Sequence, residues 1–219
     1  MQAAILAGGR GKRLQPITDY IPKPLIPVAN IPILEWQLRY LKDQGIAEVV
    51  VCTGYKAEMI QNYLVRHHHD TVTVSVEDTP MGTGGAIKNA ANCITGGEFV
   101  VLNGDVITDI SISDLDTNSI AAVPLRTTFG ILELKGDRIV RFGEKAIISN
   151  KWMNAGIYRF EASVLDQLPV KGDLERTLFP KWAEDGQLGV TRFADAVWHS
   201  IDSFKDIEEC AGMLKEAYR

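Results

Sequence analysis

Glycines and positive charges are concentrated in the first 23 positions, where they could bind a polyanion. The loop Gly8-Gly9-Arg10-Gly11-Lys12-Arg13 contains three cations, and Lys23 follows between two prolines. Glycine lets the backbone approach a ligand closely, and free N–H groups in such a loop bind phosphate oxygens. These residues therefore predict a site for a polyanion such as a nucleoside triphosphate.

Three acids further along the chain could complete such a site. Glu77, Asp105 and Asp202 each follow a short apolar or β-branched run. A carboxylate at Asp105 is suited to Mg²⁺, a hard ion that prefers oxygen ligands and shared phosphates. The alternatives without chemistry are a turn aspartate for Asp105, an acid at a helix start for Asp202 and a solvated glutamate for Glu77.

Two common phosphate-binding motifs do not fit the glycine loop. A P-loop requires Ser or Thr after Gly-Lys, whereas Arg13 follows here. A dinucleotide-binding loop requires a glycine where Leu14 stands and an acid after the next strand, which ends without one at Tyr55. An ordinary strand and turn with surface cations is the remaining alternative to a phosphate site.

The elements that must position these residues alternate along the first half of the chain. Apolar or β-branched runs predict strands, and apolar residues at helical spacing predict helices. A strand–helix alternation predicts a parallel sheet with helices on both faces, and ligands of such sheets bind beyond the carboxyl ends of the strands. The glycine loop and the three acids fall at such ends. The predicted strands are 3–7, 48–53, 71–76 and 99–102, and the helices are 31–44, 57–67 and 84–94.

The second half of the chain predicts shorter strands joined by short links. Gly136-Asp137 is a candidate hairpin turn, and Ser203 is a candidate cap for the final helix. This half is expected to add a mixed, partly antiparallel extension. The predicted strands are 120–123, 130–134, 138–142, 153–160, 189–193 and 197–200, and the helices are 163–168, 173–184 and 203–218.

Composition limits the partners and the compartment. The chain has 219 residues with 46% hydrophobic residues, enough for one core and one domain. A net charge of −5 argues against a general nucleic-acid surface. Three scattered cysteines predict a reducing compartment. Because no charged-then-apolar leader and no membrane-length apolar run occurs, we expect a cytoplasmic protein with no membrane partner.

The clustered histidines and three of the tryptophans are predicted to have structural roles. His67-His68-His69 resembles a metal cluster in composition, but consecutive helical residues do not share a face, so a solvated helix end is predicted. Trp152, Trp182 and Trp198 lie in apolar contexts and are expected in the core.

The glycine loop is also part of a longer pattern. LAGGRGKRL followed by PKPLIPVAN resembles the signature of the sugar-phosphate nucleotidyltransferases (NDP-sugar pyrophosphorylases), approximately L-A-G-G-x-G-x-R-L-x-P-L-T and then P-K-P-L. The resemblance covers nearly the whole chain and implies a Rossmann-like three-layer α/β sandwich with a mostly parallel sheet and a small mixed β extension for the sugar. It implies one domain over residues 1–219, with a nucleotide half over about 1–115 and a sugar half over about 116–219. Many relatives carry a C-terminal left-handed β-helix, and we expect none here.

The resemblance implies Mg²⁺-dependent transfer of a nucleotidyl group from a nucleoside triphosphate to a sugar 1-phosphate, with release of pyrophosphate. Arg13 would stabilise the leaving pyrophosphate and Lys23 the α-phosphate. Asp105 resembles the family's metal-binding G-D, and Asp202 resembles its second metal aspartate, although the usual D-x-G-T-P-E-D context is replaced here. The implied nucleotide-binding set is Leu6, Ala7, Gly8, Gly9, Arg10, Gly11, Lys12, Arg13, Lys23, Glu77, Gly82, Thr83 and Asp105.

Two further segments resemble substrate-binding parts of the family. Residues 77–85 resemble E-x-x-P-L-G-T-A/G-G, which lines the base pocket; a carboxylate there accepts from both guanine donors, so Glu77 favours GTP. Phe142-Gly143-Glu144-Lys145 resembles F-x-E-K, where Ala146 replaces the usual proline, and Asn154-Ala155-Gly156 resembles N-A-G. The implied sugar-phosphate set is Gly130, Glu144, Lys145, Asn154 and Gly156.

Other functions stay open at this point. A UTP- or dTTP-dependent glucose-1-phosphate enzyme and a cytidylyltransferase for an alcohol phosphate keep the fold; Glu144, Lys145 and Asn154 argue against the latter. A non-catalytic sensor of nucleotide-sugars is disfavoured because Arg13 and Lys23 are present. The sequence leaves open which sugar is used, among mannose, glucose and heptose 1-phosphates. The sequence does not determine the oligomeric state, and a homodimer is the expected one.

Overall fold

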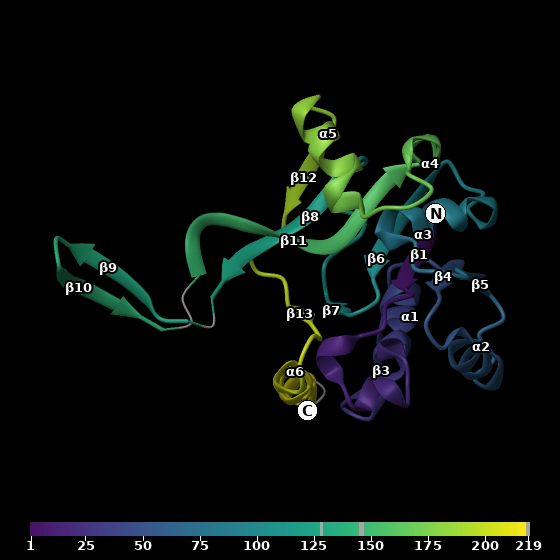
Figure 1. The fold of residues 1–219 in the computed structure, drawn as a ribbon, viewed down its shortest axis with the longest axis horizontal. Coiled ribbons are helices and arrows are strands. Elements are labelled where there is room, and N and C mark those ends of the chain that lie inside the picture. The colour runs from purple at the N-terminus through teal and green to yellow at the C-terminus, as the bar shows by residue number, and fades with distance from the viewer. Residues whose placement is uncertain (128, 145–146, 218–219) are drawn as a thin grey trace.

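A seven-stranded mixed sheet forms the centre of the molecule (Figure 1). The computed structural model describes residues 1–127, 129–144 and 147–217, without the side chains of residues 149 and 215–217. The strand order is β12-β8-β11-β6-β1-β4-β5. The neighbours β6-β1-β4-β5 pair in parallel, and β11 pairs antiparallel with β6 and β8. The predicted α/β fold with a mostly parallel central sheet is confirmed.

The first half of the chain follows the predicted alternation closely. Its main elements are β1 (Gln2–Ala7), α1 (Ile33–Asp43), β4 (Val49–Thr53), α2 (Ala57–Arg66), β5 (Val72–Val76), α3 (Gly82–Asn89), β6 (Glu98–Asn103) and β7 (Val106–Thr108). Short elements join them: η1 (Lys12–Leu14), η2 (Ile17–Asp19), η3 (Lys23–Leu25), β2 (Pro27–Val28), β3 (Ile31–Pro32) and η4 (Ala91–Cys93). The helix expected at 84–94 begins two residues earlier and ends at Asn89, with η4 after it.

Alternate side chains of the strands pack on opposite faces of the sheet. Ala3 and Ile5 of β1 join a buried cluster with the apolar faces of α1 and α2, whereas Ala4 joins a second cluster with α3 and α5. Strands buried on both faces need near-continuous apolar runs, which is the pattern of β1, β4 and β6. A third cluster packs the loop after β1 against α6 through Leu14, Ile201 and other buried residues.

The second half adds antiparallel strands and three α-helices. Its elements are β8 (Ser119–Arg126), β9 (Ile131–Lys135), β10 (Arg138–Gly143), β11 (Ile147–Glu161), α4 (Val164–Gln167), η5 (Leu174–Arg176), α5 (Leu178–Glu184), β12 (Gly189–Arg192), β13 (Trp198–Ser200) and α6 (Phe204–Ala217). The single helix expected at 173–184 is wrong: it is divided at Thr177, whose φ of −120° and ψ of −74° lie outside the α-helical region. The predicted end of the final helix at Tyr218 lies outside the described residues.

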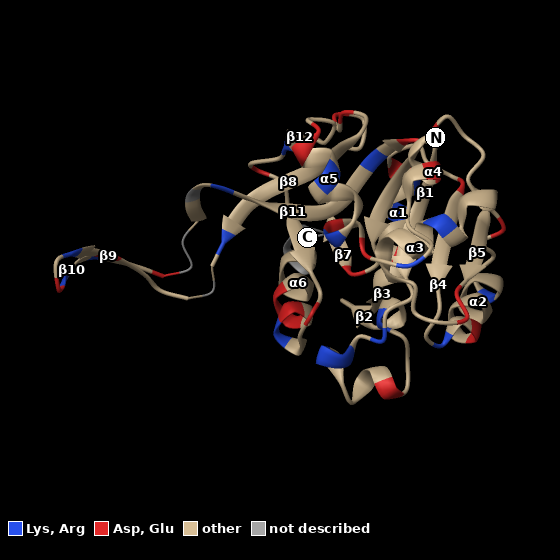
Figure 2. Cartoon of the chain, turned by 45° about the horizontal axis from the view of Figure 1, so that its top comes forward, with Lys and Arg blue, Asp and Glu red and all other residues tan. Residues whose placement is uncertain are grey.

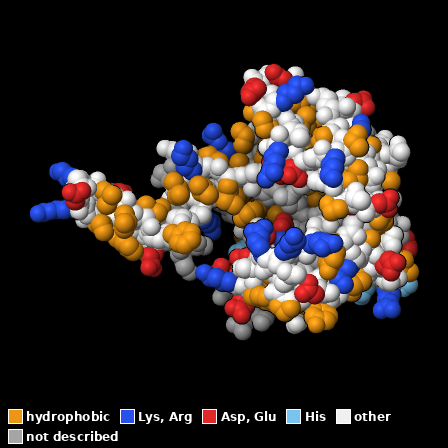
Figure 3. Space-filling model, in the orientation of Figure 1, with side chains coloured by type: hydrophobic (Ala, Val, Ile, Leu, Met, Phe, Trp, Pro, Cys, Tyr) orange, Lys and Arg blue, Asp and Glu red, His pale blue; other side chains and the backbone are white. Residues whose placement is uncertain are grey.

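The strands β9 and β10 form an arm that projects from the sheet (Figure 1). The expected hairpin turn at Gly136 is present, with a φ of +60°. Leu132 and Leu134 face Phe142 and Ile139 across the hairpin, and all four side chains are exposed. Hydrophobic side chains therefore run along the arm on the face shown in Figure 3.

The tryptophan and histidine predictions have mixed outcomes. Trp182 is buried at 4% exposure, but Trp152 is 37% exposed, so its core assignment is wrong. Trp198 packs against the core and donates to the carbonyl of Ala155 at 2.7 Å. His67 is exposed, whereas His69 contacts Glu35 at 2.9 Å and ties the end of α2 to α1. Within the described part of the chain, the structure contains no helix that is both long and apolar enough to span a bilayer.

Candidate active site

The predicted catalytic residues meet in one cavity at the carboxyl ends of β1 and β6. The cavity has a volume of about 250 Å³ and combines the loop after β1, the turn between β6 and β7, and the residues before α6. On the face shown in Figure 3, Lys and Arg side chains gather around a hollow in the body. The ribbon in Figure 2 shows basic segments close to β2 and β3 and acidic segments in α6. The lining residues are Leu6, Ala7, Gly9, Gly11, Lys12, Arg13, Leu14, Lys23, Pro24, Gly104, Asp105 and Asp202.

The glycine loop turns back onto Lys23 at Gly11. Gly11 has a φ of +61°, which is unfavourable for residues with a side chain. A Cβ there would lie 3.2 Å from the Cβ of Lys23 and 3.0 Å from the Thr18 methyl. The Gly11 carbonyl accepts hydrogen bonds from the Leu14 N–H at 2.9 Å and the Thr18 hydroxyl at 3.1 Å. A glycine at this position is therefore required to bring the loop and Lys23 together.

Asp105 is held by a turn that is anchored to three separate segments. The Gly104 N–H donates to the Leu6 carbonyl at 2.9 Å, and the Asp105 carbonyl accepts from the Ile201 N–H at 2.9 Å. A Cβ on Gly104 would collide with the Leu6 carbonyl oxygen, so only glycine allows this approach. The third anchor is Gln37 of α1, which donates to the carbonyls on both sides of Gly104-Asp105.

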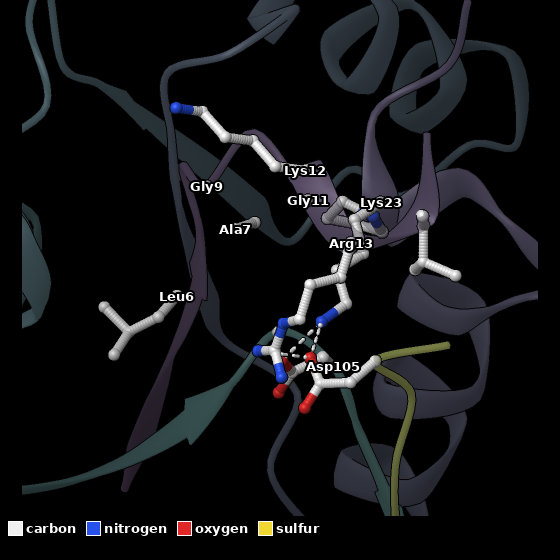
Figure 4. Close-up of a pocket in the computed structure, with 12 residues that line it drawn as sticks. Leu6, Ala7, Gly9, Gly11, Lys12, Arg13, Lys23 and Asp105 are labelled. Carbon is white, nitrogen blue, oxygen red and sulfur yellow. Dashed lines mark hydrogen bonds and ion pairs between the residues drawn. The ribbon is translucent and has the colours of Figure 1, made fainter. Parts of the chain in front are cut away.

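One lysine joins the two predicted metal aspartates. The Lys23 Nζ lies 2.6 Å from Asp105 Oδ2 and 2.8 Å from Asp202 Oδ1, and an Arg13 Nη also lies 2.8 Å from Asp202 Oδ1. Figure 4 shows the Arg13 and Lys23 side chains directed towards Asp105, while Lys12 points away from it. Burial alone would raise the pKa of Asp202, but the hydrogen bond and charge of Lys23, with the charge of Arg13, bring it below its ordinary value.

Asp202 is also fixed from the α6 side. Asp206 in the first turn of α6 accepts from the backbone N–H groups of Asp202 at 2.9 Å and Ser203 at 2.7 Å. The Ser200 hydroxyl donates to Asp202 Oδ2 at 3.2 Å. Ser203 caps the helix as expected, because its hydroxyl accepts from the Asp206 N–H at 3.3 Å. This capped helix start stands where the family pattern has a Gly- and Pro-containing turn.

The two aspartates supply carboxylate oxygens, the donors that Mg²⁺ prefers. One oxygen of each carboxylate contacts the Lys23 ammonium, so both acids face the same position. Within the described residues, no group of three or more His, Cys, Asp or Glu side chains could hold a metal ion. Two carboxylates fit Mg²⁺, since this ion usually takes one or two carboxylates together with waters and substrate phosphates.

Glu77 lies next to the glycine loop, at the carboxyl end of β5. Its carboxylate fills the space in which side chains at Gly8 and Gly54 would lie, and Oε2 accepts from the Met81 N–H at 3.1 Å. Burial raises the pKa of Glu77 above its ordinary value, while the Met81 N–H partly opposes the rise. A half-buried carboxylate between two glycines is a suitable acceptor for a planar group with paired donors.

Asn154 and Gly156 of β11 do not line the cavity and belong to a hydrogen-bonded network. Asn154 accepts from the Gly156 N–H at 2.8 Å and donates to the Tyr158 hydroxyl at 2.9 Å. That hydroxyl donates to Glu175 at 3.4 Å, and Glu175 accepts from the Thr83 hydroxyl at 3.0 Å. The network links a predicted sugar residue to a predicted nucleotide residue.

Several site residues were missed in the sequence, and others lie apart from the cavity. Gln37 and Tyr158 look like members of an apolar face, so no local signal marked them. Gly130 and Glu144 are exposed at the base of the arm and do not line the cavity. Lys145 lies outside the described residues. Arg10 also points elsewhere, because its guanidinium lies over the Tyr55 ring at 5.5 Å.

This fold and site agree with the comparisons with known proteins. A family model described as nucleotidyl transferase matches residues 2–216, and the chain belongs to this family. The prediction of an enzyme of the sugar-phosphate nucleotidyltransferase class is thereby confirmed.

Named relatives and one solved structure are similar over much of the chain. The D-glycero-alpha-D-manno-heptose 1-phosphate guanylyltransferase of Aneurinibacillus thermoaerophilus is 36% identical over 72% of this chain and 74% of its own. The mannose-1-phosphate guanyltransferase beta-B of Xenopus laevis is 32% identical over 94% of this chain, which spans only 62% of that relative. HddC from Yersinia pseudotuberculosis, solved in complex with GMP-PN, superposes with a TM-score of 0.77 at 27% identity, over 97% of this chain and 99% of HddC.

Proposed function

We propose that this protein transfers a guanylyl group from GTP to a sugar 1-phosphate, releasing pyrophosphate and an NDP-sugar. The observation that carries the proposal is the Lys23 bridge between Asp105 and Asp202 at the mouth of the glycine loop. Two polyanionic substrates repel each other, and a cavity with cations on one wall and metal-binding acids on the other lets them approach. The family and its named relatives support the same reaction class.

In the proposed reaction, an oxygen of the sugar 1-phosphate attacks the α-phosphorus in line with the departing pyrophosphate. The nucleophile is already an anion at neutral pH, so no general base is required, and the protein contributes position and charge. Arg13 is assigned to the leaving pyrophosphate, and Lys23 to the α-phosphate. Mg²⁺, held by Asp105 and Asp202, would supply neutralisation of phosphate charge.

Glu77 supports guanine as the base. Guanine offers N1–H and N2–H₂ side by side, and an ionised carboxylate can accept from both. The raised pKa of Glu77 reflects an incompletely compensated buried carboxylate, which two such donors would satisfy. The guanylyl names of the relatives and the GMP-PN complex of HddC agree with this choice.

The sugar is assigned only as a hexose or heptose 1-phosphate, with mannose and heptose favoured by the relatives. Asn154 and Gly156 are assigned to the sugar together with Glu144 and Lys145. A single domain, a cytoplasmic location and a homodimer stay predictions.

A substrate matrix tests the proposal. Purified protein with Mg²⁺ is mixed with GTP, ATP, CTP, UTP or dTTP against mannose, glucose and heptose 1-phosphates, and pyrophosphate release is measured. We expect release with GTP and one of the mannose or heptose 1-phosphates. Release with UTP or dTTP and glucose 1-phosphate would support the alternative enzyme, and no release with any pair would overturn the proposal.

A further inference from the structure

Gln37 makes two hydrogen bonds that enclose the Asp105 turn. The side chain belongs to α1 and is 2% exposed. Its Nε2 donates to the Asn103 carbonyl at 2.8 Å and to the Val106 carbonyl at 3.0 Å. These carbonyls flank Gly104-Asp105 on both sides, so one amide group holds both ends of the turn.

The carbonyl oxygen of the Gln37 side chain lowers the stability of the fold. Gln37 Oε1 is buried and has no hydrogen-bond partner in the described part of the structure. An unpaired buried acceptor destabilises the fold by about 1–3 kcal/mol, and an apolar side chain of equal length would avoid this loss. Packing alone therefore does not explain a glutamine at this position, whereas donation to two carbonyls does.

The other anchors of the turn do not replace these bonds. Gly104 is attached to β1 through the Leu6 carbonyl, and Asp105 is attached to Ile201 through its own carbonyl. These anchors come from β1 and from the segment before α6. Gln37 comes from α1 and ties the turn to this helix.

We propose that Gln37 is a positioning residue that sets the Asp105 carboxylate relative to Asp202 and thereby sets the affinity for Mg²⁺. The inference rests on the proposed function in taking Asp105 as a metal ligand. Groups that orient metal ligands typically change metal affinity or activity by about 10–100-fold when they are removed. Because Gln37 acts through the backbone of the turn, we expect the lower end of this range.

The test compares Gln37→Met with Gln44→Met. Gln44 directly follows α1, and its Oε1 accepts from the Ile112 N–H at 3.0 Å, away from Asp105. The dissociation constant of a fluorescent GTP analogue is measured with Mg²⁺ and with EDTA. The constant in EDTA divided by the constant in Mg²⁺ is the ratio that reports metal binding through linkage. Gln37→Met should reduce this ratio about tenfold without changing the constant in EDTA, and Gln44→Met should keep the wild-type ratio.

A second variant tests the inference if Gln37→Met folds poorly. In Gln37→Glu, a protonated carboxyl can donate to one carbonyl and an ionised one to none. The Mg²⁺ effect on nucleotide binding should then weaken as the pH rises through neutrality, relative to the wild type. A purely structural side chain would not produce this pH profile.

Three results would overturn the inference. The first is a wild-type ratio in both Gln37 variants. The second is a change in Gln44→Met as large as that in Gln37→Met. The third is a wild-type ratio in Asp105→Asn. Failure of the proposed reaction is recognised separately, because it appears as absent pyrophosphate release in the substrate matrix and not as a change in nucleotide binding.

Discussion

Lys23→Met is the most direct test of the assembled site. The Lys23 ammonium lies between two carboxylates, and the Lys23 side chain is 13% exposed against 26% for Asp105 and 28% for Asp202. Removing one partner of a fully buried ion pair costs about 3–5 kcal/mol. Here both acids are partly exposed and Arg13 still contacts Asp202, so we expect a loss of stability of about 1–3 kcal/mol.

The same change should affect the reaction more strongly than the fold. Losing one preorganised donor of transition-state charge lowers the rate by about 10²–10³, or about 2.7–4 kcal/mol. Single-turnover pyrophosphate release measures this loss. Without the lysine ammonium, the two acids have a vacant cation position, so Mg²⁺ should raise the melting temperature of Lys23→Met more than that of the wild type.

Lys88→Met provides the matched control. The Lys88 Nζ donates to the Leu165 carbonyl at 2.6 Å on the α3–α4 side of the sheet, away from the cavity. This variant should lose stability but keep its rate. If folded Lys23→Met turns over at nearly the wild-type rate, the role assigned to Lys23 is refuted.

Three further predictions concern single residues. The pKa of Asp202 in the folded protein lies below its ordinary value of 3.8. Asp202→Asn should therefore lower the free energy of unfolding by its full amount above pH 3.8, and the difference from the wild type should vanish as the pH falls below that value. Denaturant unfolding at several pH values measures this difference. Glu77→Gln should lower kcat/KM for GTP by roughly 10–100-fold, the equivalent of about 1.5–3 kcal/mol for hydrogen bonds to a charged group, and should affect UTP less; equal losses for both bases would contradict the guanine assignment. Gly156→Ala should destabilise the protein by about 1–3 kcal/mol, because φ is +72° and a Cβ would lie 2.6 Å from Asn103 Nδ2. No loss is expected in the control Gly212→Ala, where a Cβ meets nothing within 4 Å. Equal unfolding midpoints for the two variants would contradict the argument.

Much of the site was predictable because its residues directly follow strands. The apolar runs of β1 and β6 mark buried strands, and parallel strands bring their carboxyl ends to one edge. The sequence therefore predicts that Gly11 and Asp105 lie close together. Their motifs also predict the family and the fold, and both predictions are confirmed. Arg13 and Lys23 line the same cavity as Asp105, while their catalytic roles stay predictions.

The residues that were missed or misplaced depend on distant partners. Gln37 finds its two carbonyls 66 and 69 positions away, and nothing in the local pattern of α1 marks it as other than a face residue. The helix expected at 173–184 is divided at Thr177, and its first residue depends on a distant partner, because Asp173 Oδ1 accepts from the Thr83 N–H of α3 at 3.4 Å. Trp152 is exposed because it lies near the arm, with the Arg192 guanidinium 5.4 Å from its ring centroid.

The bridge from Lys23 to Asp202 spans 179 positions of sequence. A ribosome extends the chain from its N-terminus, so the lysine emerges long before the aspartate that completes its contacts. A nascent chain can form the glycine loop early, yet it cannot neutralise this lysine from both sides until α6 is reached. The reaction centre therefore cannot close until Asp202 has been synthesised, 179 positions after the lysine.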